Sequence, residues 1–242
     1  MKNAAIILAA GLGKRFCGAT SGEVKHKVSK QFLNINGKPM FLWSVEAFAS
    51  VKNFEQIIVV VPPKMIETLS LKYEKYRTNF VFVPGGNERF ESVRNALFIV
   101  GNDIDFVAVH DAARPLISRE DILSILKSAK KKGAAIAVEE TRDTIKLVSD
   151  VDGEYSKYVL KTLNRAVLRN AQTPQIFESS LLKRAYFEKI THDVVSDDSQ
   201  LVENLKVKVA VVETKFLNFK ITTKQDFKLA AALFALKSKV YK

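Results

Sequence analysis

The sequence is poor in the residues that form disulfides and zinc sites. It holds one cysteine, Cys17, and three histidines, His26, His110 and His192, among 242 residues. A single cysteine excludes an intramolecular disulfide and any site built from several cysteines, and the histidines are not spaced as zinc ligands. This composition suits a reducing compartment, so we expect a cytoplasmic protein.

The sequence also lacks a hydrophobic run long enough to cross a membrane. A spanning helix needs about 20 apolar residues, whereas the longest apolar stretches are Ala4–Leu12, Ile57–Pro63 and Leu229–Leu236. The first stretch follows Lys2 as a secretory signal would, but it leads into Lys14 and Arg15, where a cleavage site needs small residues. We therefore expect no membrane partner and interpret this stretch as a buried first strand.

Acidic residues are outnumbered, with 26 Asp and Glu against 38 Lys and Arg, for a net charge of +12. The hydrophobic share of 47% excludes a disordered chain. Many of the cations end predicted helices, where the helix dipole favours them, and no basic stripe with interleaved aromatic residues is present. We therefore expect no nucleic-acid partner and keep a basic nucleic-acid-binding module as the last alternative; phosphate-rich small substrates would use the same charge.

Short apolar runs alternate with helical patterns along the chain. Runs rich in β-branched residues predict buried strands at Ala4–Leu8, Gln56–Val61, Phe80–Val83, Phe106–His110, Ala134–Val138 and Val207–Val212. The intervening patterns predict helices at Met40–Ser50, Lys64–Tyr76, Arg89–Val100, Ser118–Lys132 and Thr223–Lys237. Because no linker or internal repeat interrupts this order, it predicts one doubly wound, mostly parallel α/β domain over residues 1–242.

One segment does not follow the alternation. From Glu139 to Leu163 the chain is charged and strand-like, with a turn signal at Asp152-Gly153. Such a segment fits poorly in a buried sheet, so it predicts a β-hairpin arm that protrudes from the domain.

The loop after the first strand is the first candidate site, because ligands of open parallel sheets bind beyond the carboxyl ends of the strands. Small residues from Ala9 to Gly11 allow backbone N–H groups to approach phosphate oxygens, and Lys14 and Arg15 add charge. The loop is not a dinucleotide fingerprint, because the third glycine would fall at Phe16, and it is not a Walker A loop. Phosphate binding and a tight glycine turn with solvated cations are equally open here.

Two later loops also carry polar groups at strand ends. Gly86 precedes a helix and Ser92 lies about one turn into it, which allows an anion or base-edge site, although an ordinary loop is the simpler explanation. Asp111 ends the fourth predicted strand, where a carboxylate can hold Mg²⁺ beside a triphosphate, and a structural ion pair with Arg114 explains it equally well. We interpret His110 as a buried, hydrogen-bonded histidine instead of a catalytic base.

Eight motifs occur in a fixed order over nearly the whole chain. They are Leu8-Ala9-Ala10-Gly11-Leu12-Gly13-Lys14-Arg15; Lys30-Gln31-Phe32-Leu33 followed by Gly37-Lys38-Pro39; Gly85-Gly86-x-x-Arg89-x-x-Ser92-Val93; Val109-His110-Asp111-Ala112-Ala113-Arg114-Pro115; Arg142-Asp143-Thr144-x-Lys146; Gln172-Thr173-Pro174-Gln175-x-Phe177; Asp197-Asp198; and Phe219-Lys220-Ile221-Thr222-Thr223. Each is weak alone. Together they resemble the 2-C-methyl-D-erythritol 4-phosphate cytidylyltransferase family of the non-mevalonate isoprenoid pathway.

The resemblance implies a Rossmann-like nucleotidyltransferase that transfers CMP from CTP to 2-C-methyl-D-erythritol 4-phosphate, with Mg²⁺, and releases pyrophosphate and 4-diphosphocytidyl-2-C-methyl-D-erythritol. It implies that Arg15 and Lys30 are catalytic cations, since such transfers depend on fixed charge around the phosphates. It assigns the nucleotide to Ala9, Ala10, Gly11, Gly86, Ser92, Asp111 and Ala112, the metal to Asp111, and the acceptor to Thr144, Arg165, Thr173 and Lys220.

The resemblance further implies a homodimer, in which the arm clasps a second subunit and carries Arg165 into its active site. The loop before Lys30 is longer than in the family, and Ser29 stands where a proline is usual, so Lys25 and Lys27 are alternatives to Lys30. We choose Lys30 because the Gln31-Phe32-Leu33 motif that follows it sets the register.

Two other functions stay open at this stage. A related family, the ribitol 5-phosphate cytidylyltransferases of teichoic acid synthesis, more often has Gly-Gly and Thr-Arg in the first loop. The sequence Ala9-Ala10-Gly11 and the sequence Ala112-Ala113-Arg114 favour the methylerythritol phosphate enzyme. The nucleic-acid-binding module is the alternative from a different class.

Overall fold

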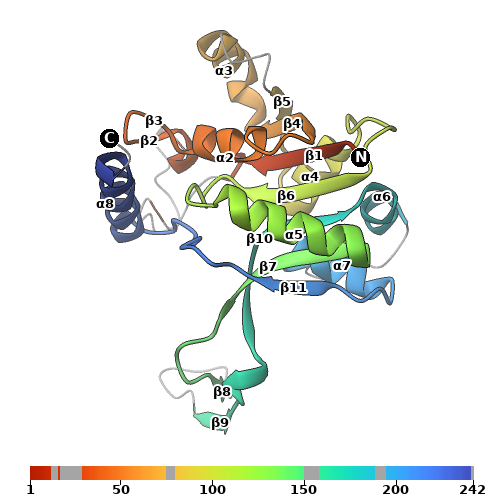
Figure 1. Cartoon of the computed structure of the whole chain (residues 1–242), viewed down its shortest axis with the longest axis vertical. Coiled ribbons are helices and arrows are strands. Elements are labelled where there is room, and N and C mark those ends of the chain that lie inside the picture. The colour runs from red at the N-terminus through yellow and green to blue at the C-terminus, as the bar shows by residue number, and fades with distance from the viewer. Residues whose placement is uncertain (12–15, 17–28, 75–79, 150–157, 189–194, 241–242) are drawn as a thin grey trace.

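A seven-stranded sheet with the order β11-β7-β10-β6-β1-β4-β5 forms the centre of the computed structural model (Figure 1). The structure describes residues 1–11, 16, 29–74, 80–149, 158–188 and 195–240. The strands of this sheet are β1 (Asn3–Leu8), β4 (Phe54–Val61), β5 (Val81–Pro84), β6 (Phe106–Asp111), β7 (Ala134–Glu140), β10 (Arg169–Glu178) and β11 (Ala210–Glu213). All six predicted strands are present, and the prediction of an α/β fold is confirmed.

The sheet is mostly parallel, and β10 is the exception. β1 pairs in parallel with β4 and β6, and β5 and β11 pair in parallel with β4 and β7. β10 runs antiparallel between β6 and β7. The apolar pattern did not predict β10 as a strand, because its buried positions include Gln172, Thr173 and Gln175, which are polar.

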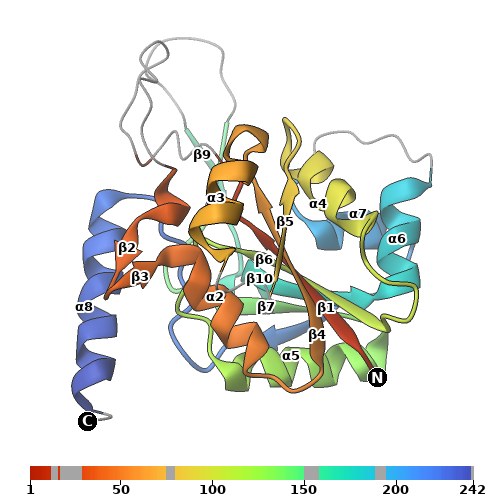
Figure 2. The ribbon, with the colours of Figure 1, turned by 90° about the horizontal axis from the view of Figure 1, so that it is seen from above.

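Helices cover both faces of the sheet (Figure 2). One face packs against α2 (Met40–Ala49), α3 (Ile66–Lys72) and α5 (Arg119–Lys132), and the other against α4 (Arg89–Leu97), α6 (Ser179–Phe187) and α7 (Asp198–Asn204). Successive side chains of a strand point to opposite faces. Along β1, Ala5 and Ile7 accordingly enter one core layer and Ala4 and Ile6 the other.

Local signals set the ends of the helix that connects β6 to β7. The Ser118 hydroxyl accepts a hydrogen bond from the backbone N–H of Asp121 at 3.0 Å, which caps the first turn of α5. Gly133 ends the helix with a φ of 83°, a conformation that glycine adopts without a Cβ clash. The crossover therefore ends where β7 must begin.

The C-terminal helix lies apart from the two helical layers. Helix α8 (Lys224–Val240) packs beside the short hairpin of β2 (Asn34–Ile35) and β3 (Lys38–Pro39). Its residues Ala230 and Phe234 form a third apolar cluster with Ile35 and Met40. Of the helices described, none is both long enough and apolar enough to cross a membrane.

The predicted arm is present and projects from the sheet where β7 and β10 extend beyond it (Figure 1). Its tip holds the antiparallel strands β8 (Lys146–Val148) and β9 (Val159–Thr162). The predicted turn at Asp152-Gly153 lies outside the described residues. Three short 3₁₀ turns complete the described elements: η1 (Lys30–Phe32), η2 (Pro63–Met65) and η4 (Arg165–Val167).

Candidate active site

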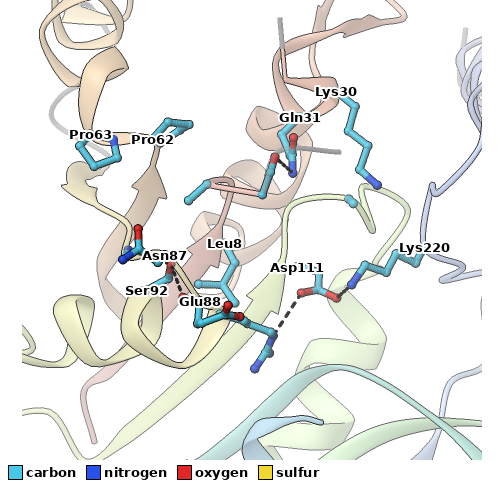
Figure 3. A pocket seen from close by; sticks show the side chains of 15 residues that line it. Leu8, Lys30, Gln31, Pro62, Pro63, Asn87, Glu88, Ser92, Asp111 and Lys220 are labelled. Carbon is cyan, nitrogen blue, oxygen red and sulfur yellow. Dashed lines mark hydrogen bonds and ion pairs between the residues drawn. The ribbon is translucent and has the colours of Figure 1, made fainter. Parts of the chain in front are cut away.

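A cavity of about 490 Å³ lies beyond the carboxyl ends of β1, β4, β5 and β6 (Figure 3). This is the edge at which open parallel sheets bind ligands. Residues at these strand ends and in the segments that follow them line it, together with three residues from elsewhere, Lys30, Gln31 and Lys220. The full lining is Leu8, Ala10, Gly11, Lys30, Gln31, Pro62, Pro63, Gly86, Asn87, Glu88, Arg89, Ser92, Asp111, Ala113 and Lys220. Most of the predicted nucleotide and phosphate residues therefore meet in one place.

The loop after β1 is held from both sides. The Ala9 N–H donates to the carbonyl of Val60 at 2.8 Å, and Ala9 is fully buried, so it supports the loop from behind the cavity. The Gly11 carbonyl accepts hydrogen bonds from the Ser29 hydroxyl at 2.8 Å and from the Gln31 amide at 3.2 Å. Ala10 and Gly11 line the cavity, whereas the predicted catalytic residue Arg15 lies outside the described residues.

Two lysines enter the cavity from distant parts of the chain. Lys30 on η1 donates from Nζ to the carbonyl of Ile221 at 2.6 Å, across 191 residues of sequence. Lys220, the neighbour of Ile221, reaches the same cavity, and Figure 3 shows both side chains on one side of it. The two lysines give this side of the cavity a positive charge. The alternative cations Lys25 and Lys27 lie outside the described residues.

Asp111 at the end of β6 lies among three cations. Its Oδ2 is 2.8 Å from Lys220 Nζ and 3.7 Å from Arg114 Nε, and its Oδ1 is 3.9 Å from Arg89 Nε. Burial by itself would raise the pKa of this carboxyl, but the charges of Lys220 and then Arg89 outweigh burial and hold the pKa well below its usual range. Asp111 is therefore ionised at any physiological pH.

The residues behind Asp111 are neutral and fully hydrogen-bonded. Nε2 of His110 lies 3.2 Å from the carbonyl of Arg114, which can only accept, so Nε2 carries the ring proton and donates it. Nδ1 therefore accepts from the Thr173 hydroxyl, 3.1 Å away, and that hydroxyl accepts from the Asp111 N–H at 3.0 Å. Burial lowers the pKa of His110 to about 4. His110 is thus a buried, uncharged histidine, as the sequence analysis interpreted it.

The donor set restricts how a metal ion fits. The described residues contain no group of three or more His, Cys, Asp or Glu side chains able to hold a metal ion. The buried Asn218 donates its amide to Gln172 and to the Thr173 carbonyl, and its Oδ1 makes no hydrogen bond. Mg²⁺ is commonly held by one carboxylate together with substrate phosphates. Asp111 fits that pattern as the single protein ligand.

The loop after β5 closes the far side of the cavity. The Gly86 N–H donates to the Ser92 hydroxyl at 3.1 Å, and that hydroxyl donates to the carbonyl of Glu88 at 3.1 Å. A Cβ on Gly85 would come within 2.5 Å of the Ala10 Cβ. Only glycine therefore lets the loops after β1 and β5 approach this closely and form one narrow wall.

Comparisons with known proteins identify the family. The chain matches the family model for IspD, 2-C-methyl-D-erythritol 4-phosphate cytidylyltransferase, over residues 3–236. A protein of that name from Endomicrobium trichonymphae is 65% identical over 230 residues, which cover 95% of this chain and 97% of the relative. The chain belongs to the 2-C-methyl-D-erythritol 4-phosphate cytidylyltransferase family. The predicted family and enzyme class, in the non-mevalonate isoprenoid pathway, are therefore confirmed.

Solved structures of this cytidylyltransferase family share the fold. A 4-diphosphocytidyl-2C-methyl-D-erythritol synthase from Anaerococcus prevotii superposes with a TM-score of 0.78 at 29% identity, covering 97% of this chain and 98% of its own. The cytidylyltransferase from Thermus thermophilus gives a TM-score of 0.75 at 32% identity, covering 96% and 98%. The coverage extends over the arm as well as the sheet.

Five predicted residues of this cytidylyltransferase, among those described, do not line the cavity of their own chain. Ala9 is one of them, since it supports the loop after β1 from behind the cavity. Ala112 is buried and donates its N–H to the carbonyl of Leu8, and the next residue, Ala113, lines the cavity instead. Thr173 lies behind Asp111, as described above. Thr144 and Arg165 are exposed on the arm, where Arg165 donates to the carbonyl of Arg142.

Among the cavity residues of the enzyme that were given no role from the sequence are Arg89 and Gln31. Both appeared only as parts of motifs in the sequence. Arg89 is the first residue of the helix after the Gly85-Gly86 loop. The sequence signal for Arg89 was its position as a cation at the start of a helix, just after a glycine pair that ends a strand. Such a position lies at the edge of the sheet where ligands bind.

Proposed function

We propose that this cavity is where the chain transfers CMP from CTP to the phosphate of 2-C-methyl-D-erythritol 4-phosphate. An acceptor phosphate oxygen attacks the α-phosphorus of CTP, the bond from that phosphorus to the bridging oxygen breaks, and pyrophosphate leaves with the bonding electrons. The carrying observation is the cluster of Asp111, Lys220, Arg89 and Lys30 in one cavity at the strand ends. Fixed cations of this kind stabilise the charge that builds on a transferring phosphoryl group.

The placement of the two lysines supports this proposal. Lys30 and Lys220 come from different segments, and the bond from Lys30 to the Ile221 carbonyl holds the segments together. Both ammonium groups would face the triphosphate, and Arg15 would add a third cation from the loop after β1. Lys220 pairs with Asp111 at 2.8 Å. Its ammonium group can donate more than one hydrogen bond, so it would also bind an acceptor or triphosphate oxygen through a charge-assisted bond.

Asp111 is the residue that would hold Mg²⁺, with the phosphates of CTP supplying further oxygens. The ion would neutralise phosphate charge and orient the triphosphate for in-line attack. The support for this role is chemical: Asp111 is held ionised by its neighbours, and its backbone N–H is fixed by Thr173. His110 supplies no proton, since its buried ring stays neutral.

The opposite wall is suited to the nucleoside. Ala10, Gly11 and Gly86 present backbone atoms at the cavity, and Ser92 presents a hydroxyl beside Gly86. We assign the ribose and cytosine to this wall, with Ala9 and Ala112 as its supports. A base edge recognised by backbone groups and one hydroxyl leaves little room for a purine.

The arm supports a proposed homodimer. Its apolar side chains are exposed, with Tyr158 at 67%, Leu160 at 63% and Val159 at 59% exposed. Clustered exposed apolar residues mark an interaction surface. Thr144 and Arg165 lie on the same arm, so a second subunit is the available way to bring them to a substrate phosphate. We also propose a cytoplasmic location, which the single cysteine suits.

Pyrophosphate release from CTP tests the proposed reaction directly. The assay compares 2-C-methyl-D-erythritol 4-phosphate, ribitol 5-phosphate and no acceptor, each with Mg²⁺ present and removed by a chelator. We expect release only with the first acceptor and only with the metal. Faster release with ribitol 5-phosphate would indicate that the chain catalyses the teichoic acid reaction instead. Release without any acceptor would indicate simple CTP hydrolysis.

A further inference from the structure

We propose that Asp198 and Tyr186 are positioning residues for the reaction, which orient Arg89 toward the CTP-binding cavity. This inference rests on the proposed function of the cavity. It concerns a buried network on the face of the sheet that α4, α6 and α7 cover, in which α4 is distant in the sequence from the other two helices.

The network is built around a carboxylate with no exposure to solvent. Asp198, the first residue of α7, is 0% exposed. Its Oδ1 and Oδ2 accept hydrogen bonds from Nη1 and Nη2 of Arg89 at 2.8 and 2.6 Å, across 109 residues of sequence. Oδ1 also accepts a hydrogen bond from the Tyr186 hydroxyl on α6. Two parallel bonds of this kind fix the plane of a guanidinium group as well as its position.

The bidentate pair determines which atom of Arg89 faces the cavity. With both Nη atoms bonded to Asp198, Nε is the nitrogen nearest Asp111, 3.9 Å from its Oδ1. Arg89 is also one of the residues that line the cavity. Arg89 thus lies between two carboxylates, one that anchors it and one that belongs to the site. A lysine in its place would carry the charge but could not form two parallel hydrogen bonds, because an ammonium group lacks the planar pair of Nη donors.

Asp198 is itself held rigidly against the sheet. Gln175 of β10 donates from Nε2 to Asp197 at 2.8 Å and accepts from the Ser199 N–H at 3.0 Å, so it ties both neighbours of Asp198 to the strand. The ring of Tyr186 stacks on Phe90 of α4, with centroids 4.8 Å apart. Because Phe90 follows Arg89 directly, the same contacts fix the tyrosine and the backbone that carries the arginine.

The charges of the network are mutually stabilised. Burial by itself lowers the pKa of Arg89, but Asp198 and its hydrogen bonds outweigh burial, so the pKa of Arg89 is raised. Burial and the adjacent Asp198 raise the pKa of the Tyr186 hydroxyl well above its ordinary value, so this hydroxyl remains a donor. Arg89 therefore stays charged, and the Tyr186 hydroxyl stays protonated, at any pH at which the enzyme works.

Loss of the anchor would change the site without removing a cavity residue. An Arg89 released from Asp198 can turn both Nη atoms to Asp111, the only other carboxylate within ion-pair distance of it among the described residues. It would then compete with Lys220 and with the metal for that carboxylate. The predicted consequence is weaker CTP binding and slower transfer, with the acceptor KM little changed.

Three variants test the network. Tyr186→Phe removes one hydroxyl and keeps the ring that stacks on Phe90, Asp198→Asn keeps the shape of the anchor but not its charge, and Arg89→Lys keeps the charge but not the planar pair of Nη donors. Glu188→Gln is the matched control, because it breaks a solvent-exposed pair with Arg184 at the end of the same α6 helix. Thermal unfolding of each variant checks the fold.

The readouts are the CTP dissociation constant by calorimetry and the kcat and KM for each substrate. We expect Asp198→Asn to lower kcat/KM for CTP by about 10- to 100-fold and Tyr186→Phe by about 2- to 10-fold. The acceptor KM should stay within about twofold, and Glu188→Gln should match the wild type. In the Arg89→Lys background, Asp198→Asn should lower kcat/KM for CTP little further, because both changes remove the same bidentate contact.

Two results would overturn the proposal. One is wild-type CTP binding and turnover in both Asp198→Asn and Tyr186→Phe. The other is an equal loss for CTP and acceptor that multiplies with Arg89→Lys, as a general structural defect would. If Asp198→Asn does not fold, Tyr186→Phe decides alone. A wild-type chain that binds CTP but releases no pyrophosphate would contradict the proposed function, while the CTP affinities would still decide this inference.

Discussion

The cavity and the arm carry charged residues in opposite ways. In the cavity Asp111 is 8% exposed and its three cationic neighbours come from three separate segments, each held by hydrogen bonds or ion pairs. On the arm Arg165 is exposed and bonds to the backbone of the same arm. The comparison teaches that a packed core holds each charged group in place through contacts with several segments. A protruding hairpin instead presents its charged groups to solvent or to another surface.

The difference also has an energetic side. Buried charges are costly to desolvate and depend on their partners, so removing one leaves the others uncompensated. Exposed charges are screened and individually contribute little to stability. Substitutions in the cavity should therefore affect the chemistry and the local structure together, and substitutions on the arm should affect one substrate at a time.

The largest effect on turnover is expected from Lys30, one of the two lysines of the cavity. Lys30→Ala removes a cation that we place at the phosphates during transfer, so turnover should fall by about 100- to 1,000-fold with the fold intact. Steady-state kinetics and circular dichroism measure the two quantities. Lys52→Ala, an exposed lysine between α2 and β4, is the control and should be unchanged. Activity within a few-fold of the wild type would remove Lys30 from the catalytic residues.

The arm should show a smaller and more selective effect. Arg165→Ala removes one charge-assisted contact to the acceptor phosphate, worth about 1.5–3 kcal/mol, so the acceptor KM should rise roughly tenfold or more while the CTP KM stays the same. Light scattering measures the oligomeric state in parallel. An active monomer would contradict a shared site.

Mixing two impaired variants, assayed at an acceptor concentration below the wild-type KM, sharpens the same comparison. In a heterodimer of Lys30→Ala and Arg165→Ala chains, both lesions fall in one site if the arm crosses to the partner, and the other site is intact. We expect recovery of up to about half the wild-type activity per heterodimer. Proven heterodimers without any recovery would show that Arg165 acts within its own chain or not at all.

The nucleoside wall should respond more weakly. Ser92→Ala removes a hydroxyl that contacts both Gly86 and Glu88, and it should weaken CTP binding by about 0.5–1.5 kcal/mol. Calorimetry with CTP and ATP measures both affinity and base choice. Equal use of the two nucleotides by the wild type would refute the assignment of cytosine to this wall.

The smallest effect on catalysis is expected from the titration of His110. Its folded pKa of about 4 lies below the usual 6.5, so the stability it contributes is complete above about pH 6.5 and is lost as the pH falls toward 4. Activity near neutral pH should not depend on it. Nuclear magnetic resonance of the ring proton, assigned with His110→Gln, measures the pKa, and a value near 6.5 would contradict the buried neutral ring.

Much of the frame could be predicted from local pattern. The β-branched runs predicted six of the seven strands, because burial on both faces leaves an apolar signature that needs no tertiary information. The position of Asp111 at a strand end followed from the same pattern. The predicted strand at Val207–Val212 begins later, at Ala210, and β10 was missed because Gln172 and Gln175 are buried by hydrogen bonds to other segments.

The site was less predictable where distant segments meet. Thr173 was assigned to the acceptor, but its hydroxyl is bonded to His110 and to the Asp111 N–H behind the cavity. Arg89 and Asp198 were parts of motifs without an assigned role. They lie 109 residues apart, and the sequence around each gives no sign that the two form a bidentate pair.

The sequence by itself determined the alternation of strands and helices, the small-residue loops, the arm and the family, since each depends on residues close together in the chain. Only the tertiary structure decided which charges meet: Lys30 with the Ile221 carbonyl, Asp111 with Lys220, and Arg89 with Asp198. The physical reason is that periodicity records whether a residue is buried, whereas the partner of a buried charge is set by strand order and by the crossover connections that bring distant loops to one edge of the sheet.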